Sequence, residues 1–176
     1  MGYFGGVGLI LIQAFGGLLL TLLFLRIFLP IVGTPFRNPI CQFVYKLTNP
    51  VLGPMNHVIP SPRGISISSI ILCLIVCLIV TAASFLRFGV PLHPMWLLQL
   101  SFGMLLHAVL NFFFFAIIVY VILSFVQADR RQPLIEVTLA LALPVIRPFR
   151  RWPPRLETLD LSPFWATLII AIAKYT

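Results

Sequence analysis

The amino-acid sequence predicts an all-α integral membrane protein, because of its composition and its long apolar runs. Of its 176 residues, 60% are hydrophobic and only 9% are charged, and the mean hydropathy is +1.08. A soluble globular domain usually carries about 25% charged residues, so this class is excluded. Three cysteines are too few for a disulfide framework, which excludes small disulfide-rich folds as well.

Four apolar runs predict the membrane spans. They cover residues 8–32, 67–86, 97–126 and 163–173. The first three reach the ~20 residues that a transmembrane helix needs. From Pro163 to Thr176 the sequence has only 14 residues, roughly 21 Å of helix against a hydrocarbon core of about 30 Å. We expect this last run either to belong to a longer helix or to insert only part of the way.

A shift of 94 residues brings the prolines of the two halves into register. The pairs are Pro39 with Pro133, Pro50 with Pro144, Pro54 with Pro148, and Pro60 with Pro154. Each half then consists of a span, a proline-rich segment and a second span, which indicates an internal duplication. The predicted division is a first repeat at residues 1–88, a connecting loop at 89–96 and a second repeat at 97–176.

The repeats are expected to be parallel, because each contains an even number of spans. Both proline-rich segments then face the same compartment. These segments hold nine of the twelve basic residues, whereas the opposite side keeps only Arg87 and Lys174. The positive-inside rule therefore predicts that both segments are cytoplasmic and both termini lie outside.

A short amphipathic helix is predicted to begin at Asn38-Pro39 and to end at Asn49-Pro50. Its apolar positions recur at helical spacing and are Ile40, Phe43, Val44 and Leu47. Lys46 falls near the opposite side. Such a helix suits the headgroup layer, with its apolar stripe toward the lipid. The alternative is a helix that simply covers the bundle, and the two interpretations overlap.

The counterpart of this helix in the second repeat is predicted to run from Gln132-Pro133 to Leu143-Pro144. A turn with prolines four residues apart follows each of the two helices and predicts an interruption of regular helix. The second turn carries Arg147, Arg150 and Arg151. Together with Phe43 and Lys46, these are the candidates for contact with anionic lipid headgroups or an acidic partner. Alternatively, the arginines only follow the positive-inside rule. The basic residues form no continuous face, so no nucleic-acid partner is expected.

Three polar residues lie inside the apolar runs. Arg26 stands about six residues from the end of the first run, where it can snorkel, pair with loop groups, or contact an ion or a partner. His107 and Asn111 are four residues apart and share a helix face. They form either an intramembrane site for a proton, a cation or a haem, or an ordinary hydrogen-bonding position toward another helix.

The residue types that catalysis requires are not combined in this sequence. All four acids lie between residues 129 and 160, outside the apolar runs. Cys73 and Cys77 share a helix face, but a metal would need further ligands. The sequence also contains no glycine-rich phosphate loop and no serine-histidine-aspartate set. We therefore expect no enzyme activity, no catalytic residue, no metal and no cofactor.

The doubled proline pattern resembles that of the YggT family, which is called YlmG in Gram-positive and plastid lineages. The resemblance covers nearly the whole chain. It is carried by Leu25-Arg26-Ile27, Asn38-Pro39, Pro50 to Pro54, Pro144 to Arg151, and Leu159 to Pro163. It implies a small polytopic protein of the bacterial cytoplasmic membrane without established catalysis. Its relatives are linked to osmotic and ion homeostasis, to division and envelope organisation, and in plastids to maturation of a b-type cytochrome complex.

Two functions are open at this point. The first is an accessory or organising factor of a larger membrane complex, in contact with anionic lipids and other integral membrane proteins. The second is an ion or solute pathway, for which Arg26, His107 and Asn111 would line a polar cavity. A homo-oligomer would allow several copies to share such a pathway around one axis.

Overall fold

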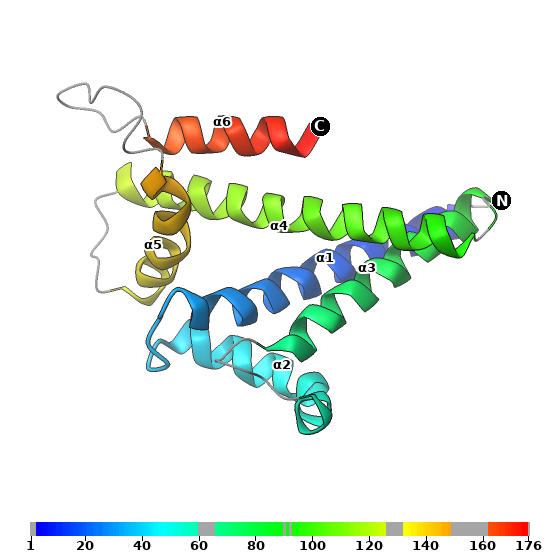
Figure 1. Cartoon of the computed structure of the whole chain (residues 1–176), viewed down its shortest axis with the longest axis horizontal. Helices are drawn as coiled ribbons and strands as arrows, with labels where there is room; N and C mark the ends of the chain where they lie inside the picture. Colours follow the sequence, from blue (N-terminus) through cyan, green and yellow to red (C-terminus); the bar gives the residue numbers. More distant parts are fainter. Residues whose placement is uncertain are drawn as a thin grey trace. The chain divides into compact units, whose positions relative to one another are not determined.

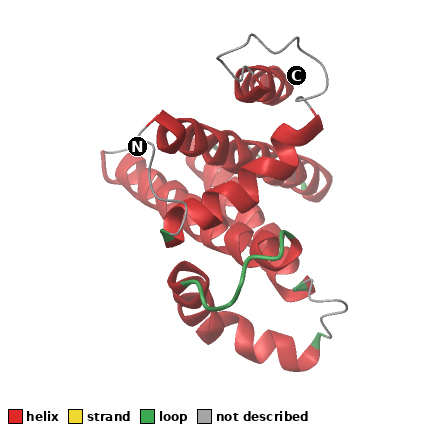
Figure 2. Ribbon diagram, turned by 90° about the vertical axis from the view of Figure 1, so that its left-hand side faces the viewer, coloured by secondary structure: helices red, strands yellow, loops and turns green. Residues whose placement is uncertain are grey.

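The computed structural model describes residues 3–59, 66–89, 91, 93–125, 132–148 and 162–175. These residues contain six helices and no strand (Figures 1 and 2). In chain order the helices are α1 (Tyr3–Ile31), α2 (Pro39–Val58), α3 (Ile67–Phe88), α4 (Pro94–Phe125), α5 (Pro133–Ile146) and α6 (Ser162–Tyr175). The predicted all-α class is confirmed.

Three helices are long and apolar enough to cross a membrane. The candidate spans are Gly6–Ile31, Ile67–Phe88 and Pro94–Ser124, and each covers most of a predicted apolar run. The fourth run corresponds to α6, which is described over 14 residues and belongs to a class of shorter apolar helices. The helix α5, also 14 residues long, belongs to the same shorter class.

The order of the helices repeats with the offset found in the sequence. The starts of α2 and α5, Pro39 and Pro133, are 94 residues apart, and those of α3 and α6, Ile67 and Ser162, are 95 apart. The ends of α1 and α4, Ile31 and Phe125, are also 94 residues apart. Both proline-initiated helices begin at the predicted residue, because proline at the first helical position needs no hydrogen-bond acceptor for its nitrogen.

The predicted end of α2 was wrong. The helix continues through Pro50 and Pro54 to Val58. Each proline removes one backbone hydrogen bond to the carbonyl four residues earlier. Pro50 and Pro54 are themselves four apart and both exposed, so the freed carbonyls fall on the outer side, where water or headgroups can bond them. The opposite side, with Thr48 and Leu52, is buried.

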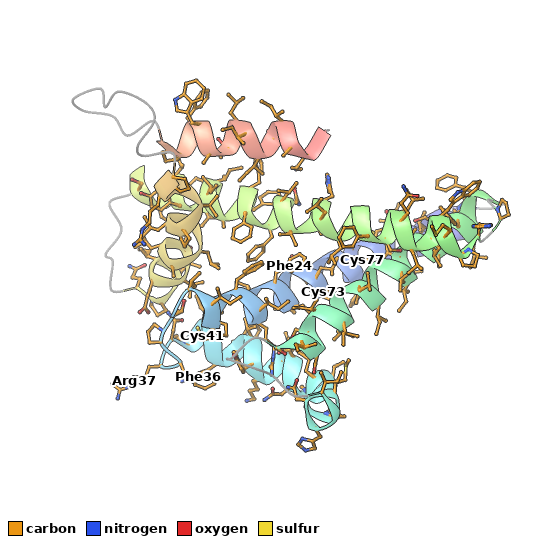
Figure 3. The ribbon with its side chains drawn as sticks, viewed as in Figure 1. Phe24, Phe36, Arg37, Cys41, Cys73 and Cys77 are labelled. Carbon is orange, nitrogen blue, oxygen red and sulfur yellow. The ribbon has the colours of Figure 1, made fainter. Side chains whose placement is uncertain are left out.

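The chain divides into two compact units, which are distinct from the two sequence repeats. One falls within Met1–Ile27 and Thr48–Ala108, and the other within Phe28–Leu47 and Val109–Thr176. In the first unit the core lies between α1 and α3. Gly16 of α1 lies against Val80 and Val76 of α3. Cys73 and Cys77 of α3 are buried (Figure 3), and so is Leu23 of α1.

The core of the second unit combines three helices. Its buried members are Ile117 of α4, Ala142 and Ile146 of α5, and Ala166 and Ile170 of α6. Figure 1 shows α6 beside the second half of α4. Phe28, at the end of α1, packs on two rings of α4: its ring centre lies 5.8 Å from that of Phe112 and 4.8 Å from that of Phe113.

Candidate functional site

Arg26 ties α1 to α2 inside the first unit. The side chain is only 5% exposed. Its Nη1 donates to Thr48 Oγ1 at 2.7 Å and to Asn49 Oδ1 at 2.9 Å. The structure thus agrees with the pairing alternative, and both of these acceptors are side chains of α2. Hydrogen bonds to a guanidinium are stronger than neutral ones and offset part of the cost of burying its charge.

Asn38 joins the beginnings of α2 and α5 inside the second unit. Its Oδ1 accepts from the backbone N–H of Ile40 at 2.9 Å, which makes Asn38 the cap of α2. Its Nδ2 donates to the Pro133 carbonyl at 2.9 Å and to Glu136 Oε2 at 2.8 Å. The two corresponding helix starts of the repeats are therefore held together by one amide.

Cys41 lies one turn into α2 and is buried (Figure 3). Burial, and secondarily the negative charge of Glu136, raises the pKa of the Cys41 thiol above its ordinary value. The thiol is therefore kept protonated and poorly nucleophilic at neutral pH.

The exposed surface of α2 has an apolar side and a polar side. The predicted single stripe is divided: Val44 is buried with Cys41, Thr48 and Leu52, whereas Phe43 and Leu47 are exposed. Phe43 is 60% exposed and is followed at four-residue steps by Leu47 and Val51. The exposed Gln42, Lys46 and Asn49 lie on the other flank. The helix α2 therefore covers the protein with one face and leaves an apolar flank exposed.

The cationic candidates of the second repeat are only partly described. Arg147 is exposed and caps the C-terminus of α5, and its backbone N–H donates to the Leu143 carbonyl. A positive charge at this end is favourable for the helix dipole. Arg150 and Arg151 lie outside the described residues, so their predicted contact with headgroups stays a prediction.

The intramembrane candidates His107 and Asn111 differ in their surroundings. His107 is exposed on α4. Asn111 is partly buried, and its Oδ1 accepts from Lys174 Nζ of α6 at 2.7 Å. The same ammonium lies 4.9 Å from the centre of the Phe114 ring. The pairing of Lys174 with Asn111 was not predicted, because it depends on how far α6 reaches along α4.

An exposed polar line on α1 was not predicted either. Gln13, Gly17 and Thr21 follow one another at four-residue spacing and are all exposed. We call these three residues the Gln13 stripe. The Thr21 hydroxyl donates to the Gly17 carbonyl at 2.9 Å, and a Cβ added at Gly17 would meet nothing within 4 Å. The spacing of a polar, a small and a hydroxyl residue inside an apolar run was the available signal.

The geometry contains no metal-binding arrangement within the described ranges: no group of three His, Cys, Asp or Glu side chains there could hold a metal ion. What the helices and their polar contacts define is a multi-span, all-helical membrane protein with duplicated halves.

Comparison with known proteins gives the family. The model of the CCB3/YggT family matches residues 7–86 and 99–176, two segments of similar length that agree with the duplication. The chain belongs to the CCB3/YggT family.

Two bacterial proteins are similar to the chain over most of its length. The chain is 33% identical to protein PA0392 of Pseudomonas aeruginosa over 164 residues, which is 92% of this chain and 83% of the relative. It is 32% identical to the YggT protein of Escherichia coli K12 over 150 residues, 85% of this chain and 78% of the relative. Both relatives are described as uncharacterized. No solved structure matches.

Proposed function

We propose that this chain is a non-catalytic accessory subunit that binds another integral membrane protein and supports assembly or organisation of a larger complex. The Gln13 stripe is the observation that carries the proposal. It lies within the candidate span Gly6–Ile31, so its exposed amide would face hydrocarbon, which offers no hydrogen bonds. A partner helix removes that cost by bonding to the amide.

The form of the stripe suits a helix as its partner. Helices associate in membranes where small residues let their backbones approach and where polar side chains bond across the contact. Gly17 supplies the open space, and Gln13 supplies two donor and two acceptor positions. The exposed His107 on α4 offers a second polar position of the same kind.

The test is to fill the stripe and then measure partner recovery. We expect Gly17→Ile and Gln13→Leu to lower the amount of protein that co-purifies from native membranes by roughly tenfold, the equivalent of about 1.4 kcal/mol of binding free energy. The control is Gly8→Ile, also on α1, where an added Cβ meets nothing within 4 Å. Recovery that is unchanged by both stripe variants contradicts the proposal.

An ion or solute pathway is the alternative that reconstitution tests. In the structure Arg26 is engaged with α2 and Asn111 with α6, which favours structural roles for both. If purified protein in liposomes conducts K⁺ and Arg26→Leu or His107→Leu abolishes the flux, the pathway replaces the accessory role.

We also propose that the protein lies in the bacterial cytoplasmic membrane, with both proline-rich segments in the cytoplasm and both termini outside. The charge distribution supports this orientation. Lys46 is exposed on α2, so Lys46→Cys is expected to react with an impermeant maleimide only after the membrane is disrupted. Ser124→Cys, exposed near the end of α4, is expected to behave in the same way. Labelling of either cysteine in intact cells would show that the proline-rich segments lie outside, which contradicts the proposed orientation.

A further inference from the structure

The first half of α4 exposes a line of three residues at four-residue spacing. Gln99, Gly103 and His107 are all exposed, and positions four apart lie on one face of a helix. We call these three residues the His107 stripe. A Cβ added at Gly103 would meet nothing within 4 Å. Phe102 and Leu106 are exposed beside it, so large apolar side chains border a line of polar and small residues.

The depth of the stripe in the membrane follows from Trp96, near the start of α4. Tryptophan prefers the boundary between headgroups and hydrocarbon, and Trp96 is exposed. His107 stands 11 residues later, which is about 16 Å along the helix at 1.5 Å per residue. Half the thickness of the hydrocarbon core is about 15 Å. The imidazole therefore faces the middle of the bilayer, where lipid offers its nitrogens no hydrogen bond.

Of the three candidate spans, α4 is covered least by the described remainder of the chain. In its apolar stretch only 6% of the residues are buried, against 22% in α1 and 33% in α3. Ser101 is completely buried, and it lies about 160° around the helix from Gly103, at 3.6 residues per turn. The contacts of α4 with its own chain at this level are thus opposite the His107 stripe, which faces outward and is open to another span.

Each polar group of the stripe is complementary to itself. A glutamine amide has two donor and two acceptor positions, and a neutral imidazole has one of each. Two copies inserted with the same orientation bring their α4 helices together in parallel, around a two-fold axis along the membrane normal. Such an axis places each stripe residue beside its own counterpart. Gln99 and His107 can then each bond to the same residue of the second copy, while Gly103 lets the two backbones approach.

We propose that two copies of this chain form a dimer through the His107 stripe of α4. The inference goes beyond the proposed function, because the accessory partner is assigned to the Gln13 stripe of α1, which the dimer leaves open. The dimer supplies the exposed polar groups of α4 with the hydrogen bonds that lipid lacks. It also presents one Gln13 stripe on each copy, so that a single assembly holds two partner helices.

The first experiment is cysteine cross-linking of the full chain in native membranes. A two-fold contact places position 103 against itself, so Gly103→Cys alone is expected to form a disulfide-linked species of twice the chain mass on oxidation with copper phenanthroline. The control is Leu98→Cys, exposed on α4 but about 140° around the helix from Gly103. We expect roughly tenfold less of the linked species there, because a disulfide requires Cα atoms within about 7 Å. The wild-type chain, whose three cysteines are buried, is the blank.

The second experiment measures the dimer fraction by single-molecule photobleaching of labelled protein in liposomes, over a range of protein-to-lipid ratios. We expect Gly103→Ile to weaken dimerisation roughly tenfold, and His107→Leu roughly threefold, the usual size of an interhelical hydrogen bond. Leu98→Ile changes an exposed apolar residue of the same helix off the stripe and is the matched control. Thermal unfolding of each variant checks the fold, and His107→Leu keeps the test decisive if Gly103→Ile fails to fold.

Other occupants of the stripe give different results, each of which overturns the inference. If the wild-type chain is monomeric at every protein-to-lipid ratio, lipid covers the stripe. If Gly103→Cys cross-links to a different protein, the stripe belongs to that protein. If Gly103→Cys links only to Gly17→Cys of a second copy, α1 docks on α4 and the two-fold contact is wrong. Dimers that Gly103→Ile and Leu98→Ile weaken equally would also exclude the stripe.

The dimer and the proposed accessory role fail independently. Gly17→Ile is expected to lose the accessory partner and to keep the dimer, whereas Gly103→Ile is expected to lose the dimer and to keep the partner. If the wild-type chain dimerises through Gly103 but retains no other protein, the inference stands and the accessory role falls. If it retains a partner through Gly17 and stays monomeric, the accessory role stands and the inference falls.

Discussion

Gly16→Ile is expected to lower the free energy of unfolding by about 3 kcal/mol, the upper end of the usual cost of overpacking. A Cβ at Gly16 would lie 2.7 Å from Val80 Cγ2 and 3.7 Å from Val76 Cγ1. Valine in a helix is largely confined to one rotamer, so its methyl group cannot swing aside. The helices α1 and α3 must separate instead. The measurement is unfolding by SDS titration in mixed micelles.

The matched control is Gly17→Ile, one residue further along α1. An added Cβ there meets nothing within 4 Å, and exposed substitutions usually change stability by less than about 0.5 kcal/mol. Gly16→Ile is therefore expected to impair folding, and Gly17→Ile to impair partner binding. Equal losses of stability in the two variants would show that α1 does not pack on α3 through Gly16.

Thr48→Val is expected to cost about 2 kcal/mol of stability, the usual range for a hydrogen bond to a charged group. The substitution nearly conserves shape but removes the hydroxyl that lies 2.7 Å from Arg26 Nη1. Thr48 and Arg26 are 4% and 5% exposed, respectively, so water replaces the lost bond poorly. Thr21→Val is the control, because that exposed hydroxyl donates only to the Gly17 carbonyl of its own helix.

A double-mutant cycle with Arg26→Met tests the cause. When the guanidinium is absent, Thr48→Val no longer leaves a buried charge without its acceptor. The double variant is therefore expected to lose less unfolding free energy than the sum of the losses in the two single variants. Replacing both members of a buried polar interaction is often much less harmful than removing one. Strict additivity in the same SDS titration would contradict the assigned contact.

Much of the architecture could be predicted because it is encoded locally. Apolar runs long enough to span, and the Asn38-Pro39 and Gln132-Pro133 pairs at helix starts, are properties of neighbouring residues, and they predicted most helix boundaries to within a few residues. The 94-residue register and the resemblance to the YggT family are likewise visible in the sequence. The end of α2 was mistaken because proline in a helix is a local cost that burial of Thr48 and Leu52 can outweigh.

The candidate sites were predicted less well. Pairing was one of the alternatives predicted for Arg26, but its acceptors on α2 were not predicted, and neither was the contact of Lys174 with Asn111. The Gln13 stripe carried a sequence signal, yet only the structure showed that it is exposed.

The sequence by itself determined the all-helical membrane class, the duplication, the family and the starts of α2 and α5, since helix formation and membrane insertion depend on short stretches of chain. Only the tertiary structure decided which face of α2 is buried, that Asn38 bonds to Glu136 and that Lys174 reaches Asn111. The residues of each bonded pair are dozens of positions apart in the sequence, so their contact depends on which helices lie side by side.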